Sequence, residues 1–390
     1  VKFASYDKET QMLCLVNKYD FMDLSVFYLD FEIEEDGYKL FEDRLELPAL
    51  RPDDTMLIKF PYNLELDETK ESFINIQARF KDANLWAEKD YPMASAQFAL
   101  NKIDGRLKPI EESKETFDIK EDSKQITLEN KGFKISFDKQ NGEILYWKYD
   151  GFEVISDRKG SPHYNNNRWI ENDKHGDSIS GELASTCEIN INKEKTKAEI
   201  KVTTKGEKCP YTIEYTVYSN NIVDMKVTMN PIVEGLRRLG LGMIFSKDFE
   251  EIDYYAKGPW ENYNDRQEAS FVGRYSTTVS DMLTPYAHPQ SCGNRQEMRE
   301  ITLYKKHSNK GIKIESNQPI AFSMLHFDDK DFIKEVLHPW ELKPRKEVYA
   351  HFDYVQRGLG NGSCGPQTIE KYQVPSSGTY SFTLRFSPLR

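Results

Sequence analysis

Three segments of the chain concentrate planar polar side chains next to aromatic rings or glycine. They read GPWENYNDR (258–266), SDMLTPYAHPQSCGNRQEMR (280–299) and RGLGNGSCGP (357–366). Amide, carboxylate and guanidinium groups form directional hydrogen bonds, and aromatic faces pack against flat apolar surfaces. These loops could therefore form the rim of a pocket of about the size of a sugar ring. A rigid loop scaffold tied by charge pairs would use the same residue types.

The side chains that we expect to build this loop platform carry a charge, an amide or an indole. They are Trp260, Glu261, Asn262, Asp265, Arg266, Asn294, Arg295 and Glu297. We expect the acidic and basic members to tie the loops together through arginine–carboxylate forks. Such forks specify geometry more reliably than they stabilise a fold.

The remaining motifs exclude several kinds of chemistry. The chain has 64 Asp and Glu residues, so sequence alone cannot select a general acid and a nucleophile among them. It contains no GxSxG, Walker or HExxH motif, and no helical pattern follows the glycines of 358–362 that could bind phosphate. The five cysteines are far apart and form no CxxC, so we expect thiols rather than zinc ligands. We predict no cofactor and no metal site in this chain.

Charge and hydropathy limit the partners. The formal net charge is −11. Nucleic acids and anionic membranes bind basic surfaces, so this charge argues against either of them as the main partner. No run approaches the ~18 apolar residues of a membrane-spanning helix. The first residues read as a strand and not as a signal peptide, so the sequence leaves the compartment undetermined, cytoplasmic or periplasmic.

The elements that must position these loops are strands. Alternation at period two, as in SFINIQARF (72–80), predicts an all-β chain with an immunoglobulin-like sandwich over residues 1–103. A charged linker is expected over 104–124, and a large double-layer β-sandwich over 125–390. Asn141-Gly142 and Asn220-Asn221 lie between β-patterned runs and predict hairpins, the first with a type I′ turn. Helical periodicity is nearly absent, which excludes a (β/α)₈ barrel.

Taken together, the segments resemble the C-terminal part of the glycoside hydrolase family 2 β-galactosidases. The three loops are similar to the last domain of that family, as are RWIENDK (168–174) and HFDDKDFIKEVLHPWEL (326–342). LVNKYDFMDLS (15–25) and NLWAEKDYPMASAQFAL (84–100) resemble the immunoglobulin-like domain before it. The matches follow the family order over essentially the whole chain. The resemblance implies an immunoglobulin-like β-sandwich followed by a large galactose-mutarotase-like β-supersandwich.

The resemblance also implies a function. The chain would be the non-catalytic C-terminal portion of a retaining β-galactosidase, which hydrolyses terminal β-D-galactosides. The catalytic glutamates and the magnesium ligands of that family lie on a barrel that this sequence lacks, so no catalytic residue is carried over. The implied partners are that barrel, the N-terminal domains and the galactoside, and a homo-oligomer is left open. An excised fragment and a natural small subunit both stay open. So do two alternatives, a free-standing carbohydrate-binding module and a mutarotase-like sugar epimerase.

Finally, the resemblance implies residues for one wall of the active-site mouth. In the family, the loop that matches GLGNGSCGP delivers one side chain near the aglycone. In one branch this is a tryptophan that stacks on the second sugar, and here it is Cys364, which cannot stack. Asn361 and Ser363 are the polar candidates on the same loop. The loop RWIENDK lies beside the mouth in the family, and its candidates are Arg168, Glu171, Asn172 and Asp173.

Overall fold

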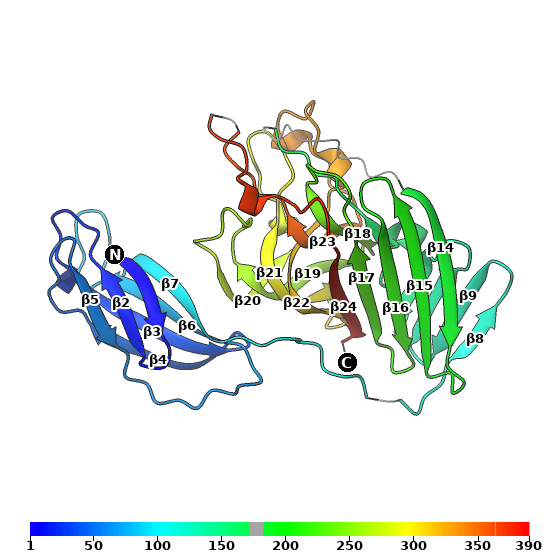
Figure 1. Ribbon diagram of the computed structural model, residues 1–390, viewed down its shortest axis with the longest axis horizontal. Coiled ribbons are helices and arrows are strands. Elements are labelled where there is room, and N and C mark those ends of the chain that lie inside the picture. Colours follow the sequence, from blue (N-terminus) through cyan, green and yellow to red (C-terminus); the bar gives the residue numbers. More distant parts are fainter. Residues whose placement is uncertain (112, 172–181, 363, 390) are drawn as a thin grey trace. The chain divides into compact units, whose positions relative to one another are not determined.

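The chain folds as two compact β units. The computed structural model describes residues 1–111, 113–171, 182–362 and 364–389. Its backbone contacts separate unit 1, Val1–Asp104, from unit 2, Gly105–Arg390 (Figure 1). In the described residues, all regular structure is β-strand apart from short 3₁₀ turns, so the all-β prediction is confirmed. No helix in these ranges is long and apolar enough to cross a membrane.

Unit 1 is a sandwich of two antiparallel sheets, as expected for an immunoglobulin-like domain. One sheet has the order β1-β2-β5 and the other β4-β3-β6-β7. Strand β3 alternates as the sequence pattern requires, with Leu29, Phe31 and Ile33 buried in the core between the sheets. The strands are β1 (Lys2–Asp7), β2 (Met12–Val16), β3 (Phe27–Glu35), β4 (Tyr38–Glu46), β5 (Thr55–Lys59), β6 (Ser72–Phe80) and β7 (Pro92–Asn101), with one 3₁₀ turn, η1 (Leu24–Val26).

Unit 2 begins with a five-stranded sheet of order β12-β11-β10-β9-β8. Its strands are β8 (Asp118–Glu121), β9 (Gln125–Asn130), β10 (Phe133–Asp138), β11 (Ile144–Tyr149) and β12 (Phe152–Glu153). Strand β8 therefore forms inside the range expected to be a linker. The residues before it also bond to unit 2, because the Arg106 amide donates to the Asn317 carbonyl at 3.3 Å.

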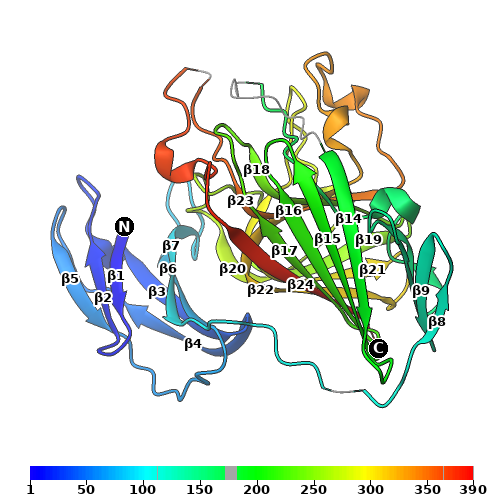
Figure 2. The same cartoon turned by 45° about the vertical axis from the view of Figure 1, so that its right-hand side comes forward.

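The second sheet of unit 2 is large and curved, as Figures 1 and 2 show. It has twelve strands, ordered β13-β18-β23-β22-β24-β17-β16-β15-β14, with β19, β20 and β21 attached through β22. Its strands are β13 (His163–Tyr164), β14 (Glu182–Ile191), β15 (Lys197–Gly206), β16 (Tyr211–Tyr218), β17 (Val223–Met229), β18 (Arg238–Phe245), β19 (Phe249–Gly258), β20 (Phe271–Thr278), β21 (Arg295–Lys305), β22 (Gly311–Leu325), β23 (Val348–Gln356) and β24 (Tyr380–Pro388). Apolar side chains of both sheets share one core, in which Trp147 and Phe386 have ring centroids 5.1 Å apart.

In the described residues, the connections between the strands of unit 2 include five 3₁₀ turns. The 3₁₀ turns are η2 (Asp157–Gly160), η3 (Ser280–Met282), η4 (Asp329–Asp331), η5 (Pro339–Glu341) and η6 (Glu370–Tyr372). In both ribbon views, the orange segment with η4 and η5 and the red segment that precedes β24 project from the same end of the large sheet (Figures 1 and 2).

Both predicted hairpins form, but the first turn differs from the expected type. A type I′ turn needs positive φ at both central residues. Of Asn141 and Gly142, only Gly142 has a positive φ, +75°, and the connection spans 139–143. The Gly142 amide donates to the Asp138 carbonyl at 2.9 Å, which closes this wider loop. A Cβ on Gly142 would lie 2.2 Å from the Val202 side chain, so this loop packs directly on β15.

Candidate functional site

The segments singled out in the sequence meet around one cavity in unit 2. This loop cavity has a volume of about 160 Å³. Its lining comes from all three loops and from the stretch after β13: Ile170, Tyr263, Arg266, Tyr286, Gln290, Ser291, Leu359, Gly360 and Gly362. Two larger cavities, of about 510 and 410 Å³, are lined by other parts of the chain, the first by η2 and β14–β16 and the second by unit 1.

The loop after β19 holds the loop after β23 by main-chain hydrogen bonds. The two carboxylate oxygens of Asp265 accept from the amides of Leu359, at 3.0 Å, and Gly360, at 2.8 Å. Arg266 donates to the Gly360 carbonyl and, at 3.2 Å, to the Asn361 side chain. A Cβ on Gly358 would lie 2.6 Å from the Asp265 Cγ. Glycine at this position is therefore what allows the two loops to approach so closely.

The loop after β20 is fixed to the same platform. Glu261 accepts from the Tyr286 hydroxyl and, at 2.8 Å, from the Gly293 amide. Burial, together with this hydrogen bond to Glu261, raises the pKa of Tyr286. The main-chain amide of Asn262 donates to the main-chain carbonyl of Asn294 at 2.8 Å, and the Asn294 side chain donates to the main-chain carbonyl of Asn262 at 2.7 Å. This reciprocal pair joins the two loops.

Most of the bonds that tie these loops together go to main-chain groups, and not between arginines and carboxylates as expected. Arg295 donates to main-chain carbonyls, those of Pro259 and Gly293, each at 3.1 Å. Buried loops leave many backbone groups to satisfy, and charged side chains are used for that purpose here. Glu297 does form ion pairs, with Lys257 at 2.9 Å and with Arg299 at 3.3 Å. Burial opposes ionisation, but these two cations lower the pKa of Glu297.

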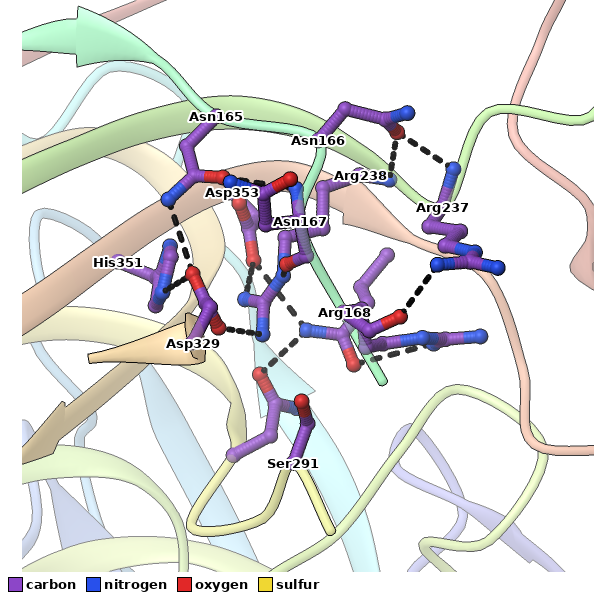
Figure 3. Close-up of polar contacts among 12 residues, drawn as sticks. Asn165, Asn166, Asn167, Arg168, Arg237, Arg238, Ser291, Asp329, His351 and Asp353 are labelled. Carbon is purple, nitrogen blue, oxygen red and sulfur yellow. Dashed lines mark hydrogen bonds and ion pairs between the residues drawn. The ribbon is translucent and has the colours of Figure 1, made fainter. Parts of the chain in front are cut away.

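A run of three asparagines, 165–167, follows β13, and Ile170 shortly after it lines the loop cavity. Figure 3 shows polar contacts of this run. The Asn166 side chain accepts from the Arg237 amide at 2.7 Å and from the Arg238 amide at 3.1 Å. Trp169 and Ser291 bond reciprocally, the Trp169 amide to the Ser291 hydroxyl at 3.0 Å and the Ser291 amide to the Trp169 carbonyl at 2.9 Å. Because Ser291 lines the cavity, these bonds fix one side of it.

A buried charged cluster contacts the asparagine run through Asn165 (Figure 3). Arg238 pairs with Asp353 at 2.8 Å and lies 3.8 Å from Asp329, and His351 approaches the other Asp329 oxygen at 3.0 Å. That oxygen also accepts from the Asn165 side chain at 2.9 Å. Burial opposes ionisation, but His351 and Arg238 lower the pKa of Asp329 to about 2. No sequence pattern indicated this cluster, although the three consecutive asparagines at 165–167 were a visible signal.

The residues expected in the pocket wall do not all lie at the surface of the cavity. Arg168 is buried beneath the loops and donates to Gln356 and to the Arg357 carbonyl. Burial, with nearby Arg238, lowers the pKa of Arg168. Glu171 lies 3.2 Å from the His288 ring nitrogen, next to the cavity lining. The trio Asn172, Asp173 and Ser363 lies outside the described residues.

The loop after β23 carries the other wall candidates. Asn361 accepts from Arg266, and its amide donates to the Pro366 carbonyl at 3.0 Å, which closes the loop on itself. Cys364 is exposed, with its amide 3.2 Å from the Asn361 carbonyl. Of the platform residues, Trp260 is largely exposed to solvent, at 71%.

The lining of the loop cavity carries several hydrogen-bonding groups. It offers a guanidinium, phenol and serine hydroxyls and main-chain groups that can orient a polar ligand. None of the described lining residues is acidic. Within the described parts of the chain, no group of three His, Cys, Asp or Glu residues could hold a metal ion.

Comparisons with known proteins give a consistent result. A family model described as "Beta galactosidase small chain" matches residues 129–386, and one described as "Beta-galactosidase, domain 4" matches 13–101. A β-galactosidase of Priestia megaterium is 20% identical, over 100% of this chain and 38% of its own length. One of Streptococcus thermophilus is 24% identical, over 95% of this chain and 36% of its own. The chain therefore spans well under half the length of these curated relatives.

Two solved structures are similar to this chain at a low level. An aldose 1-epimerase of Escherichia coli, described as putative, matches with a TM-score of 0.37 and 8% identity, over 70% of this chain and 99% of its own. A galactose 1-epimerase of Lactobacillus acidophilus also has a TM-score of 0.37, with 11% identity, 70% coverage of this chain and 98% of its own.

Proposed function

Because this chain belongs to the β-galactosidase family, we propose that it works as the non-catalytic, C-terminal portion of a retaining β-galactosidase and forms one wall of the active-site mouth. The observation that carries the proposal is the loop cavity. Loops that are far apart in the sequence meet there and are bonded to one another through Asp265, Arg266, Glu261 and Asn262. Loops used for binding are commonly held in this way on a rigid scaffold.

In this proposal the chemistry is divided between two parts of the enzyme. The catalytic carboxylates and the magnesium site of the family belong to the barrel, and this chain supplies no metal ligand and no proton-transfer group. Its contribution is orientation. Groups that hold a substrate in a reactive position can supply a large part of a rate enhancement without touching the reacting atoms. The loop cavity would act on the aglycone side of a galactoside.

Cys364 sets the expected affinity of this wall for the aglycone. The residue is exposed on the loop after β23. A thiol has no flat face, so it cannot stack on a pyranose ring as an aromatic side chain can. We therefore propose a wall that binds the second sugar weakly, through hydrogen bonds from neighbours such as Asn361.

Reconstitution tests the proposal. The purified chain alone is expected not to hydrolyse a nitrophenyl galactoside, because removing both catalytic carboxylates collapses the rate by many orders of magnitude. Mixing it with the polypeptide that carries the barrel should restore hydrolysis. Turnover by the chain alone, prepared from a host without its own β-galactosidase, would refute the assignment. A mixture that stays inactive and unassociated would refute it as well.

A further inference from the structure

We propose that one end of unit 1 is a docking surface for the barrel-bearing part of the β-galactosidase. This surface, which we call the aromatic end, consists of Phe21, Val26, Leu85, Trp86 and Tyr91. The inference rests on the proposed function, because it takes the rest of such an enzyme as the partner. It adds the place of contact, which neither the family match nor the loop cavity supplies.

The residues of the aromatic end are unusually exposed for their size. Phe21 is 99% exposed and Trp86 63%, and Leu85 is fully exposed. Single exposed apolar residues are common on protein surfaces, but a group of large ones marks an interaction site more often than chance. Aromatic residues are also the ones most enriched at the energetic centres of protein interfaces.

These side chains come from two loops that leave the same end of the sandwich. Phe27 at the start of β3 pairs with Phe80 at the end of β6. The loop before β3 carries Phe21 and Val26, and the loop after β6 carries the other three residues. The Trp86 ring packs edge-on against Phe80, with centroids 5.6 Å apart. The exposed surface therefore continues directly from the core of unit 1.

Side-chain amides hold the first of these loops in place. Asn17 is fully buried, and its amide nitrogen donates to the carbonyls of Met22, at 2.8 Å, and Leu50, at 2.9 Å. Its oxygen accepts from the Tyr19 amide at 2.9 Å. Phe21 is thus presented on a braced loop rather than on a flexible one.

The second loop is braced in the same way. The Asn84 side chain accepts from the amides of Trp86 and Ala87, both at 3.0 Å, so Leu85 forms the tip of a closed turn. Farther along, Arg79 donates to the Asp90 carbonyl at 2.8 Å. A surface already fixed in its bound shape loses less conformational entropy on association, which favours docking.

Two observations identify the partner. The model that matches residues 13–101 describes a fourth domain, and the relatives are far longer than this chain, which covers 36–38% of them. In such enzymes the remaining part of the polypeptide, which includes the barrel, is therefore large enough to offer a surface for docking. The charged side chains around the aromatic end are of both signs, as in the polar rim of a protein interface, and do not form a basic face for an anionic polymer: Lys18, Asp20, Lys81, Asp82 and Glu88.

The test compares matched variants of the full chain. Trp86→Ser and Phe21→Ser remove rings from the aromatic end. As controls, Leu57→Ser and Tyr38→Ser remove residues about as exposed as Trp86, 64% and 63%, from strands β5 and β4 of unit 1. Binding of each variant to the barrel-bearing polypeptide is measured by titration calorimetry, with circular dichroism confirming the fold. We expect the Kd to rise roughly tenfold or more for the first pair and less than about twofold for the controls.

A photo-crosslinker identifies the occupant directly. With Leu85→p-benzoylphenylalanine, a crosslink to the barrel-bearing polypeptide supports the proposal. A crosslink to a second copy of this chain, or to unit 2 of the same chain, overturns it. Normal association with unchanged Kd in Trp86→Ser and Phe21→Ser overturns the docking surface alone. Failure of the unmodified chain to associate at all overturns the proposed function together with this inference.

Discussion

At the scale of single residues, Cys364 is where a small change should have a specific effect. We expect Cys364→Trp, measured in the reconstituted enzyme, to lower KM for a disaccharide about fivefold, because ring stacking contributes about 1 kcal/mol. The kcat for a nitrophenyl galactoside should hardly change, since no charge or proton is involved. Cys364→Ser is the control without a ring. An unchanged KM and unchanged transfer to acceptor sugars would place Cys364 outside the mouth.

Asp329 should give the free energy of unfolding a distinct acid dependence. Its pKa in the fold is lowered to about 2, below the value of about 3.9 in an unfolded chain. The unfolded state therefore binds the proton first, and stability that is complete above about pH 5 is lost as the pH falls toward 2. The loss should be roughly 2 kcal/mol.

Asp329→Asn tests this dependence. The amide leaves Arg238 and His351 without that carboxylate, so we expect a loss of about 3 kcal/mol at pH 7. Below pH 3 the difference from the unmodified protein should shrink, because the carboxylate is by then largely protonated in the unfolded chain. Urea unfolding at pH 7, 5 and 3 measures both effects. A pH-independent difference would mean that the Asp329 charge does not matter.

The sequence indicated which residues belong together at this scale but not how they bond. Glu261 and Asp265 were expected to pair with arginines and instead accept from a phenol and from backbone amides. Residue type identifies a carboxylate as an acceptor, but it cannot identify the donor. That choice depends on which backbone groups the fold leaves unsatisfied. The roles of Asp329 and His351 were missed for the same reason, since their partners lie far away in the sequence.

At the scale of elements, the bond between two loops can be tested through Asp265. Asp265→Ala removes the acceptor of the Leu359 and Gly360 amides. We expect hydrogen exchange over 358–362 to accelerate at least about tenfold, with a loss of only about 1 kcal/mol in global stability. In the reconstituted enzyme KM should rise more than kcat falls.

Asp253→Ala is the matched control for this loop. Asp253 accepts from the hydroxyls of Ser276, at 2.6 Å, and Tyr304, at 2.9 Å, on an exposed part of the sheet in the same unit. It should leave exchange over 358–362 unchanged. If Asp265→Ala also left that exchange unchanged, other contacts would have to hold the loop, and the Arg266 bond to Gly360 would be the first to examine.

Strands were predictable from the sequence because each has a period that can be read locally. SFINIQARF became β6 over Ser72–Phe80, and both asparagine-containing hairpins formed. The predicted type of the turn at Asn141-Gly142 was wrong, because the geometry of this turn depends on how Gly142 packs against Val202. Strand β8 was missed inside a charged stretch, since an edge strand with few apolar residues has almost no local signal.

At the scale of the whole molecule, the buried apolar residues form two separate clusters, one in each unit. Leu13, Phe31 and Ile76 belong to the first, and Trp147, Ile314 and Phe386 belong to the second. The sequence could indicate two β domains of unequal size from the strand pattern and the charged stretch between them. It could not show that the residues from 105 onward belong to unit 2, because that depends on single main-chain contacts such as the one between Arg106 and Asn317.

Separate cores predict separate responses to a cavity. Ile76 and Ile314 are both fully buried, one in each core. Ile76→Ala should destabilise unit 1 by about 2–5 kcal/mol, through lost burial and an unfilled cavity. Its signature is faster native-state hydrogen exchange in β3 and β6 with no change in β22 and β24. Ile314→Ala should give the opposite pattern. If either variant accelerated exchange equally in both units, the two cores would form one cooperative unit, and the isolated-domain view of this chain would have to be abandoned.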